Sequence, residues 1–337
     1  MIKNNNNNNN NDNNNTDNNS NNKYKFFPKT KEELKQIIKN QIKQFGDEVD
    51  LNNIDVSKIT NMNSVFKHSS FNGNISEWNV SNVTNMTSMF YDSQFNNDIS
   101  SWNVSNVYKM ELMFAYSAFN QNISKWNIDN VKNMRSMFYN SKFNHNISNW
   151  NVSNVTDMFG MFYKSKFNND ISNWDVSNAK NMNSMFSGSV FNRDISNWDV
   201  SNVKTMHSMF YNSKFNQNIS DWNVSNVTNM QSMFNNSIFN NDISKWNVSN
   251  VTNMVSMFYN SKFNHDISNW DISNVTSMQS MFTYSEFNKI IGEWFIKLNK
   301  KCKLQNFGIL NNIEINSYED FEIYYKSVHR QMILDKL

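Results

Sequence analysis

The chain has 337 residues and a formal net charge of +2 at pH 7, a bias too weak to predict a nucleic acid or an anionic membrane as its partner. Its single cysteine, Cys302, excludes an intrachain disulfide. The length would allow two or three domains, but one proline and six glycines leave almost no breaks that could mark linkers.

Residues 1–23 form a low-complexity tail that is dominated by asparagine. Such a composition cannot bury a core, so we predict that this tail is disordered. It lacks the apolar stretch of a secretory signal peptide, and no run of about 18 apolar residues anywhere in the chain predicts a transmembrane helix. These features favour an intracellular location, although they leave the compartment open.

Residues 24–50 are predicted to form a capping segment at the N-terminal end of the ordered chain. Thr30 and Glu33 have the spacing of a capping box, and apolar residues at helical spacing follow over 31–45. Gly46 is typical of a helix C-terminus. We expect an amphipathic helix here, because the open end of a repeat array exposes apolar surface that must be covered.

Ten tryptophans recur every 24 residues from Trp78 to Trp294, and one period earlier the chain has Ile54. The period therefore spans ten repeats over residues 54–293, and we place the whole array at 51–294. A fixed period of this length is typical of repeat proteins, and 24 residues are too few for a helix pair or a propeller blade. The sequence predicts a parallel β-solenoid or a leucine-rich-repeat-like array of ten 24-residue coils.

Numbered from its tryptophan, each repeat follows the consensus W-N-V-S-N-V-T-N-M-x-S-M-F-x-x-S-x-F-N-x-D/N-I-S-x. Positions 3–9 and 18–22 are predicted to be short strands, and positions 10–14 a tight helical or 3₁₀ turn. Apolar positions 1, 3, 6, 9, 12, 13, 18 and 22 should line the interior. The recurring Asn and Ser should bond backbone groups at the corners, with coils stacked about 4.7–4.9 Å apart in a rod about 50 Å long.

Residues 295–337 break the period and are predicted to form the C-terminal cap. Within them, residues 318–333 have apolar side chains at roughly helical spacing. We therefore expect a helical cap at this end of the array, as at the other end.

The repeat resembles that of the BspA-type leucine-rich-repeat surface proteins, which is also known as a bacterial domain of unknown function found in many mycoplasma proteins. The stretches F-P-K-T-K-E-E-L at 27–34 and D-V-S-K-I-T-N-M at 55–62 resemble the segment that leads into that family's repeats. The resemblance covers residues 27–294. It implies a leucine-rich-repeat-like fold and protein binding or adhesion, and it supplies no catalytic residues.

Three recurring patterns could be sites, but each has a structural interpretation. Met-x-x-Met-Phe could bind Cu(I), although inward Met columns beside aromatics are typical of a core. The sequons at Asn79 and Asn82 could accept glycans, although they follow from the Asn-rich and Ser-rich consensus. At position 21, which is Asp in five repeats including Asp98, the neighbouring pairs Asp170/Asp194 and Asp242/Asp266 could hold Ca²⁺, although Asn in four of the other five repeats favours a turn acceptor. We predict no metal, cofactor or catalytic residue.

The variable positions are better candidates for recognition. Position 14 is tyrosine in five repeats, position 17 is lysine in four, and position 10 varies most. The candidate partner-binding ridge consists of Tyr91, Tyr139, Tyr163, Tyr211, Tyr259, Lys142, Lys166, Lys214 and Lys262. An exposed tyrosine ridge suits protein recognition, whereas partly buried tyrosines packed beside phenylalanine are the alternative.

The sequence thus predicts a non-enzymatic scaffold for protein–protein interaction, built from BspA-like repeats, whose protein partner is unknown. The alternative is a surface or virion-associated adhesin that binds a host protein or a glycan. An enzyme is disfavoured because no titratable residues converge in the repeat pattern. We expect a monomer without a nucleic-acid partner or a membrane span.

Overall fold

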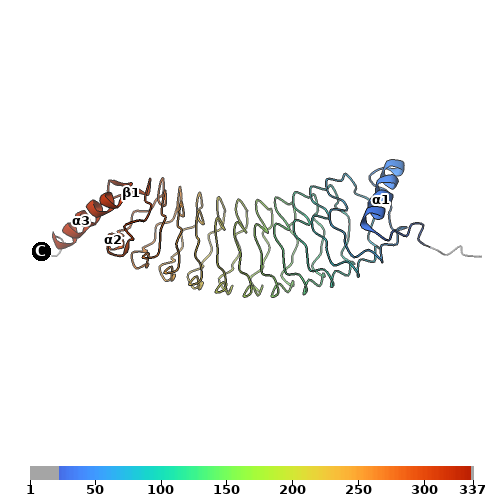
Figure 1. The fold of residues 1–337 in the computed structure, drawn as a ribbon, viewed down its shortest axis with the longest axis horizontal. Coiled ribbons are helices and arrows are strands. Elements are labelled where there is room, and N and C mark those ends of the chain that lie inside the picture. The colour runs from blue at the N-terminus through green and yellow to red at the C-terminus, as the bar shows by residue number, and fades with distance from the viewer. Residues whose placement is uncertain (1–22, 335–337) are drawn as a thin grey trace, which may run out of the picture.

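The computed structural model describes residues 23–334, so the predicted disordered tail, 1–23, lies outside the described residues except for Lys23. The chain forms a curved array of stacked coils with a helix near each end (Figure 1). All the regular elements of the described chain lie outside the repeats at 54–293. They are α1 (Lys31–Phe45), α2 (Trp294–Lys297), β1 (Gly308–Leu310), β2 (Ile313–Ile315) and α3 (Tyr318–Leu334).

The predicted capping helix over 31–45 is confirmed as α1. The Thr30 side chain accepts a hydrogen bond from the Glu33 backbone N–H at 3.1 Å, which satisfies one of the unpaired donors of the first turn. Gly46 ends the helix with a φ of 87°, a backbone conformation that L side chains rarely adopt. Leu34 and Ile38 are buried against the first coils, so α1 covers that end of the core.

The two strands predicted in each repeat are absent, and this part of the β-solenoid prediction is wrong for the described repeats. Successive coils are joined by a single parallel bridge at position 8, from Asn61↔Asn85 to Ser277↔Lys303. Side chains at positions 2, 8 and 21 accept hydrogen bonds from the N–H two residues further on, as Asn79 does from Ser81. These turns bend the chain too often for an extended strand to form.

Positions 10–14 do not form the predicted 3₁₀ turn either. In the coil that starts at Trp102, the N–H groups of Met113 and Ala115 donate to carbonyls three residues back, as in a 3₁₀ helix. The N–H groups between them donate to the next coil instead, as Phe114 does to Met137 at 2.9 Å. Positions 11 and 15 have positive φ in all ten repeats, which interrupts any right-handed helix and leaves overlapping turns.

The predicted interior is confirmed at every position. Side chains at positions 1, 3, 6, 9, 12, 13, 18 and 22 are buried in all ten repeats. Within each coil, the phenylalanine rings at positions 13 and 18 stack with centroids 4.2–4.8 Å apart. The Met columns fill the space beside these rings, so their packing interpretation holds.

The phenylalanine columns also show how the array curves. Neighbouring rings at position 13 are 5.5–5.9 Å apart and nearly parallel. Those at position 18 are 6.0–6.4 Å apart. The predicted step of about 4.7–4.9 Å is therefore wrong in the core, where stacked rings and not strand ladders set the spacing. Because the step is shorter at position 13, this column lies on the concave side of the curve in Figure 1.

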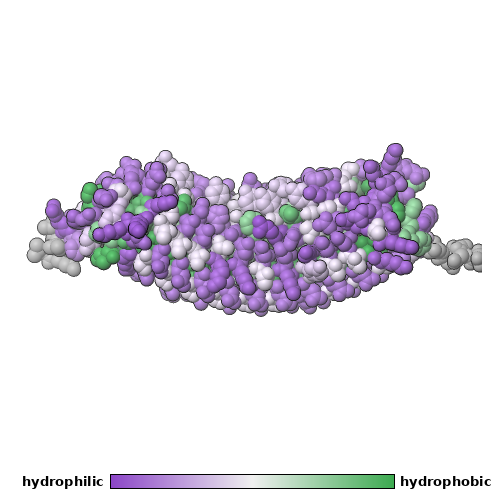
Figure 2. Space-filling view, viewed as in Figure 1, coloured by the Kyte–Doolittle hydropathy of each residue, from purple (hydrophilic) through white to green (hydrophobic). Residues whose placement is uncertain are grey.

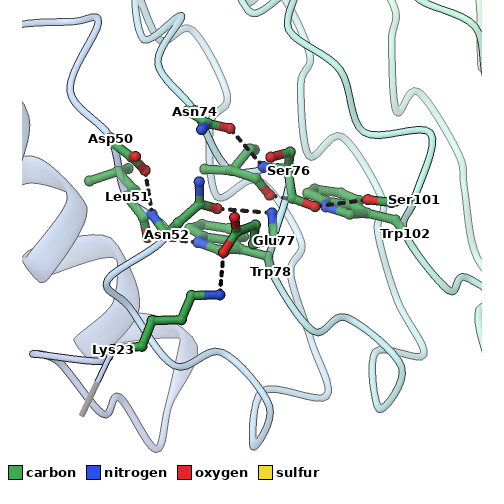
Figure 3. Close-up of polar contacts among 11 residues, drawn as sticks. Lys23, Asp50, Leu51, Asn52, Asn74, Ser76, Glu77, Trp78, Ser101 and Trp102 are labelled. Atoms are coloured by element: carbon green, nitrogen blue, oxygen red, sulfur yellow. Dashed lines mark hydrogen bonds and ion pairs between the residues drawn. The ribbon is translucent and has the colours of Figure 1, made fainter. Parts of the chain in front are cut away.

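Polar columns tie each coil to its neighbour, as predicted. Every tryptophan Nε1–H donates to a position-22 carbonyl 27 residues earlier in the chain, at 2.9–3.2 Å. Figure 3 shows the first of these bonds, from Trp78 to the Leu51 carbonyl. Nine asparagines at position 5 donate to a carbonyl of the preceding coil at 2.7–2.8 Å. These bonds satisfy backbone groups that would otherwise be unpaired at the corners.

The C-terminal cap begins with a partial coil that the sequence did not predict. The N–H groups of Met278, Ser280 and Phe282 donate to carbonyls of residues 303–307 with the pattern seen between full coils. The antiparallel pair β1 and β2 follows. The predicted helix at 318–333 is confirmed as α3, and its buried Tyr324 hydroxyl accepts from the Ile291 N–H at 3.1 Å.

Candidate partner-binding surface

Four tyrosines form a continuous row across four successive coils. The ring centroids of Tyr91 and Tyr116 are 5.6 Å apart, and those of Tyr116 and Tyr139 are 5.2 Å apart. Tyr139 stacks on Tyr163 at 4.3 Å. We call these four residues the tyrosine row. Because position 14 adjoins the buried Phe at position 13, the row lies on the concave side of the array.

Tyr116 was missed by the sequence prediction. It stands at position 15, one residue beyond the tyrosine column, because the small, buried Ala115 occupies position 14. Tyr116 has a φ of 59°, and its ring lies between the rings of the neighbouring coils. The sequence signal was a tyrosine one position away from the tyrosine column. Its meaning is clear only from the contacts between neighbouring coils.

The remaining tyrosines of the predicted ridge lie apart from the row. Tyr211 is 36% exposed, and its neighbours at position 14 are Ser187 and Asn235, which carry no ring. Tyr259 contacts Tyr284, which is 77% exposed, edge to face at 5.5 Å. The predicted single ridge is therefore divided into a row of four rings and a separate pair near the C-terminal cap.

The surroundings of Tyr139 favour the neutral form of its hydroxyl. Partial burial, followed by hydrogen bonds with the hydroxyls of Tyr116 and Tyr163, raises the pKa of Tyr139 above its ordinary value. Lys67 places its ammonium 4.8 Å from the Tyr91 ring centroid, at the N-terminal end of the row. The row thus offers flat ring surface, and at its centre the Tyr139 hydroxyl is hydrogen-bonded to those of Tyr116 and Tyr163.

Only two of the four predicted lysines come together. Lys142 and Lys166 line a pocket of about 350 Å³, together with Lys164 and Tyr116. We call this the lysine pocket, and its other lining residues are Gln94, Ser117, Ala118, Asn140 and Ser141. Lys214 is exposed away from the pocket, and Lys262 forms an ion pair with Glu286. Lys164 stands at position 15 and was not predicted.

The acidic side chains at position 21 act in turns. Asp170 and Asp194 accept hydrogen bonds from the N–H groups of Ser172 and Ser196 at 2.8 and 2.9 Å. These bonds to Ser172 lower the pKa of Asp170 below its ordinary value, because they stabilise the carboxylate. Within residues 23–334, no group of three or more His, Cys, Asp or Glu side chains is arranged to hold a metal ion.

The sequon asparagines also have structural roles. The Asn79 side chain accepts from the Ser81 N–H, and the Asn82 Nδ2 donates to the Ser57 carbonyl of the coil before at 2.8 Å. Nδ2 is the atom that an N-linked glycan would modify. At position 5, therefore, this atom is already used to join two coils.

The surface of the array is largely hydrophilic in the view of Figure 2, with hydrophobic areas near the two ends. Exposed apolar side chains include Phe27 and Phe45 at one end and Ile296, Ile309 and Ile323 at the other. No helix in the described part of the chain is long and apolar enough to cross a membrane.

Comparison with known proteins places the repeats in a family. The family model described as "Mycoplasma protein of unknown function, DUF285" matches four overlapping segments: residues 32–142, 116–216, 139–238 and 212–308. Neither the curated proteins nor the solved structures gave a significant match. Since the four segments cover most of the chain without a gap, the protein belongs to this Mycoplasma repeat family of unknown function.

Proposed function

We propose that the protein is a non-enzymatic scaffold that binds another protein along the concave side of its array. The tyrosine row is the observation that carries this proposal, because it gathers four partly exposed rings over adjacent coils. Tyrosine is enriched among the residues that dominate binding energy at protein interfaces. Its side chain offers a large contact area with few rotatable bonds.

The stiffness of the coils supports the same proposal. Side-chain bonds from position 19 join each pair of neighbouring coils at 2.7–3.0 Å, in addition to the tryptophan bonds. A surface fixed in this way loses little conformational entropy when a partner binds. The rings of the tyrosine row are thus already in place before a partner binds.

The finer family and fold labels are part of the proposal. The resemblance of W-N-V-S-N-V-T-N-M to the BspA-type repeat supports protein binding. The in-register parallel bridges at 24-residue intervals support a leucine-rich-repeat-like solenoid that lacks regular strands. We further propose that the scaffold acts as a monomer.

Alanine substitution of Tyr116, Tyr139 and Tyr163 together tests the proposal. In proximity labelling in the cells that produce the protein, the triple variant should lose labelling of a partner at least about tenfold, because interface tyrosines often contribute more than about 1 kcal/mol each. Tyr211→Ala is the matched control and should retain the partner. Thermal melting would verify that both variants remain folded.

Equal labelling of every partner by the wild type and the triple variant would refute the role of the tyrosine row. A deglycosylation shift at Asn79, or recovery of a glycan in place of a protein, would instead favour the adhesin function predicted as the alternative.

A further inference from the structure

We infer that the lysine pocket and the tyrosine row together bind an extended acidic peptide that runs along the array, with Asp or Glu at alternate residues. This inference rests on the proposed scaffold function and specifies the chemistry of the partner. It starts from the charge of the pocket. Three lysines, Lys142, Lys164 and Lys166, line it, and no aspartate or glutamate is among its lining residues.

The pocket exists because of small residues at two positions. Ala118 occupies position 17, where the next two coils have Lys142 and Lys166. Its short side chain leaves the pocket open on that side. Gly188 follows Lys164 by one coil, and a Cβ on Gly188 would lie 2.9 Å from the Lys164 Cγ. The glycine therefore leaves room for the lysine stem.

The positive charge is local, which favours a short anionic segment over a long polyanion. Position 17 carries Gln94 and Ala118 in the two coils before Lys142 and Val190 in the coil after Lys166, so the run of lysines ends on both sides. The whole chain has a net charge of only +2. Nucleic acids are bound by extended basic surfaces, and the pocket lacks such an extension.

The spacing of the coils matches an extended peptide. Lys142 and Lys166 occupy the same position in neighbouring coils, and the core rings give a step of 5.5–6.4 Å between coils. Alternate residues of an extended chain are about 6.6 Å apart and point to the same side. Carboxylates at residues i and i+2 would therefore meet successive lysines.

The alternation of side chains along an extended peptide also gives the tyrosine row a role in binding. Tyr116 belongs to the row and also lines the pocket, so the two surfaces adjoin. With its acidic side chains toward the lysines, an extended peptide directs its intervening side chains the other way, toward Tyr139 and Tyr163. Apolar or aromatic residues at those places would pack on the rings.

Fluorescence anisotropy with the full chain tests this inference. The probe is a fluorescein-labelled dodecapeptide that alternates Glu and Tyr. We expect saturable binding that weakens with salt and at least about tenfold weaker binding by K142E/K166E, because each reversed charge repels a carboxylate. The control K180E/K214E changes the net charge equally at exposed lysines outside the pocket and should bind within about twofold of the wild type. A Gln–Tyr peptide should not bind.

The inference is overturned if K142E/K166E binds the Glu–Tyr peptide like the wild type, or if the control loses as much affinity. A labelled oligothymidylate with the same charge as the peptide provides a second check. The inference is also overturned if this oligonucleotide binds more tightly than the peptide and if its binding is likewise lost in K142E/K166E. Proximity labelling with the tyrosine variants separates the two proposals. Partner loss in the triple tyrosine variant, with unchanged peptide binding by K142E/K166E, would remove the acidic-peptide inference and leave the scaffold function standing.

Discussion

At the scale of single residues, the repeat depends on side chains that combine apolar bulk with one hydrogen bond. Each tryptophan buries its ring and uses Nε1 to bond a carbonyl 27 residues earlier, as Trp174 does to the Ile147 carbonyl at 3.1 Å. A phenylalanine could fill part of the volume but could not make this bond. This dual role accounts for the tryptophan in every full coil after the first.

Trp174→Phe should lower the free energy of unfolding by roughly 1.5–3 kcal/mol, because it removes a buried hydrogen bond and leaves a small cavity. Urea denaturation followed by circular dichroism would measure the change. Tyr211→Phe alters an exposed ring and should change stability by less than about 0.5 kcal/mol. A Trp174→Phe protein as stable as the wild type would mean that the Nε1 bond contributes nothing.

The interior could be predicted residue by residue, whereas the surface could not. An apolar residue that recurs at one position of a stacked repeat, such as Met86 or Phe90, must face the inside, so the pattern alone is sufficient. Tyr116 and Lys164 have no such pattern. Their places in the tyrosine row and the lysine pocket depend on contacts between coils that only the structure shows.

At the scale of elements, the N-terminal cap was easier to predict than the repeats. The residues around α1 show a cap, a periodic apolar face and a glycine stop, each of which acts locally. Within the repeat, the Val-rich positions 3–9 suggest a strand, but Asn and Ser side chains bind nearby N–H groups and turn the chain. Composition favours β structure there, while side-chain-to-backbone bonds prevent it.

The junction between α1 and the first coil is closely packed at Gly73. A Cβ on this residue would lie 2.0 Å from the Val49 carbonyl oxygen, so Gly73→Ala must displace the segment that carries Leu51. Overpacking of this kind costs about 1–3 kcal/mol, and we expect faster hydrogen exchange at the first coils before global unfolding. Gly46→Ala meets no atom within 4 Å and strains only its own backbone, so it should leave exchange at the first coils unchanged. Unaltered exchange in Gly73→Ala would contradict this packing.

At the scale of the whole molecule, the same repeat builds both the core and the proposed binding surface. Ten similar coils give a curved array, and the side chains at positions 14, 15 and 17 differ from coil to coil along it. Rings gather on the coils that begin at Trp78, Trp102, Trp126 and Trp150, with the lysine pocket beside them. The later coils keep the core and carry Ser187 and Asn235 at position 14. Recognition should therefore be concentrated on the N-terminal half of the array.

Photo-crosslinking in the cells that produce the protein tests this central claim most directly. p-Benzoylphenylalanine placed at Tyr116 lies within the row, and the same group at Tyr211 stands at position 14 of a later coil outside it. We predict a discrete adduct with one protein partner from position 116 and none from position 211. Equal adducts at both positions, or no protein adduct at position 116, would contradict a scaffold that binds through the tyrosine row.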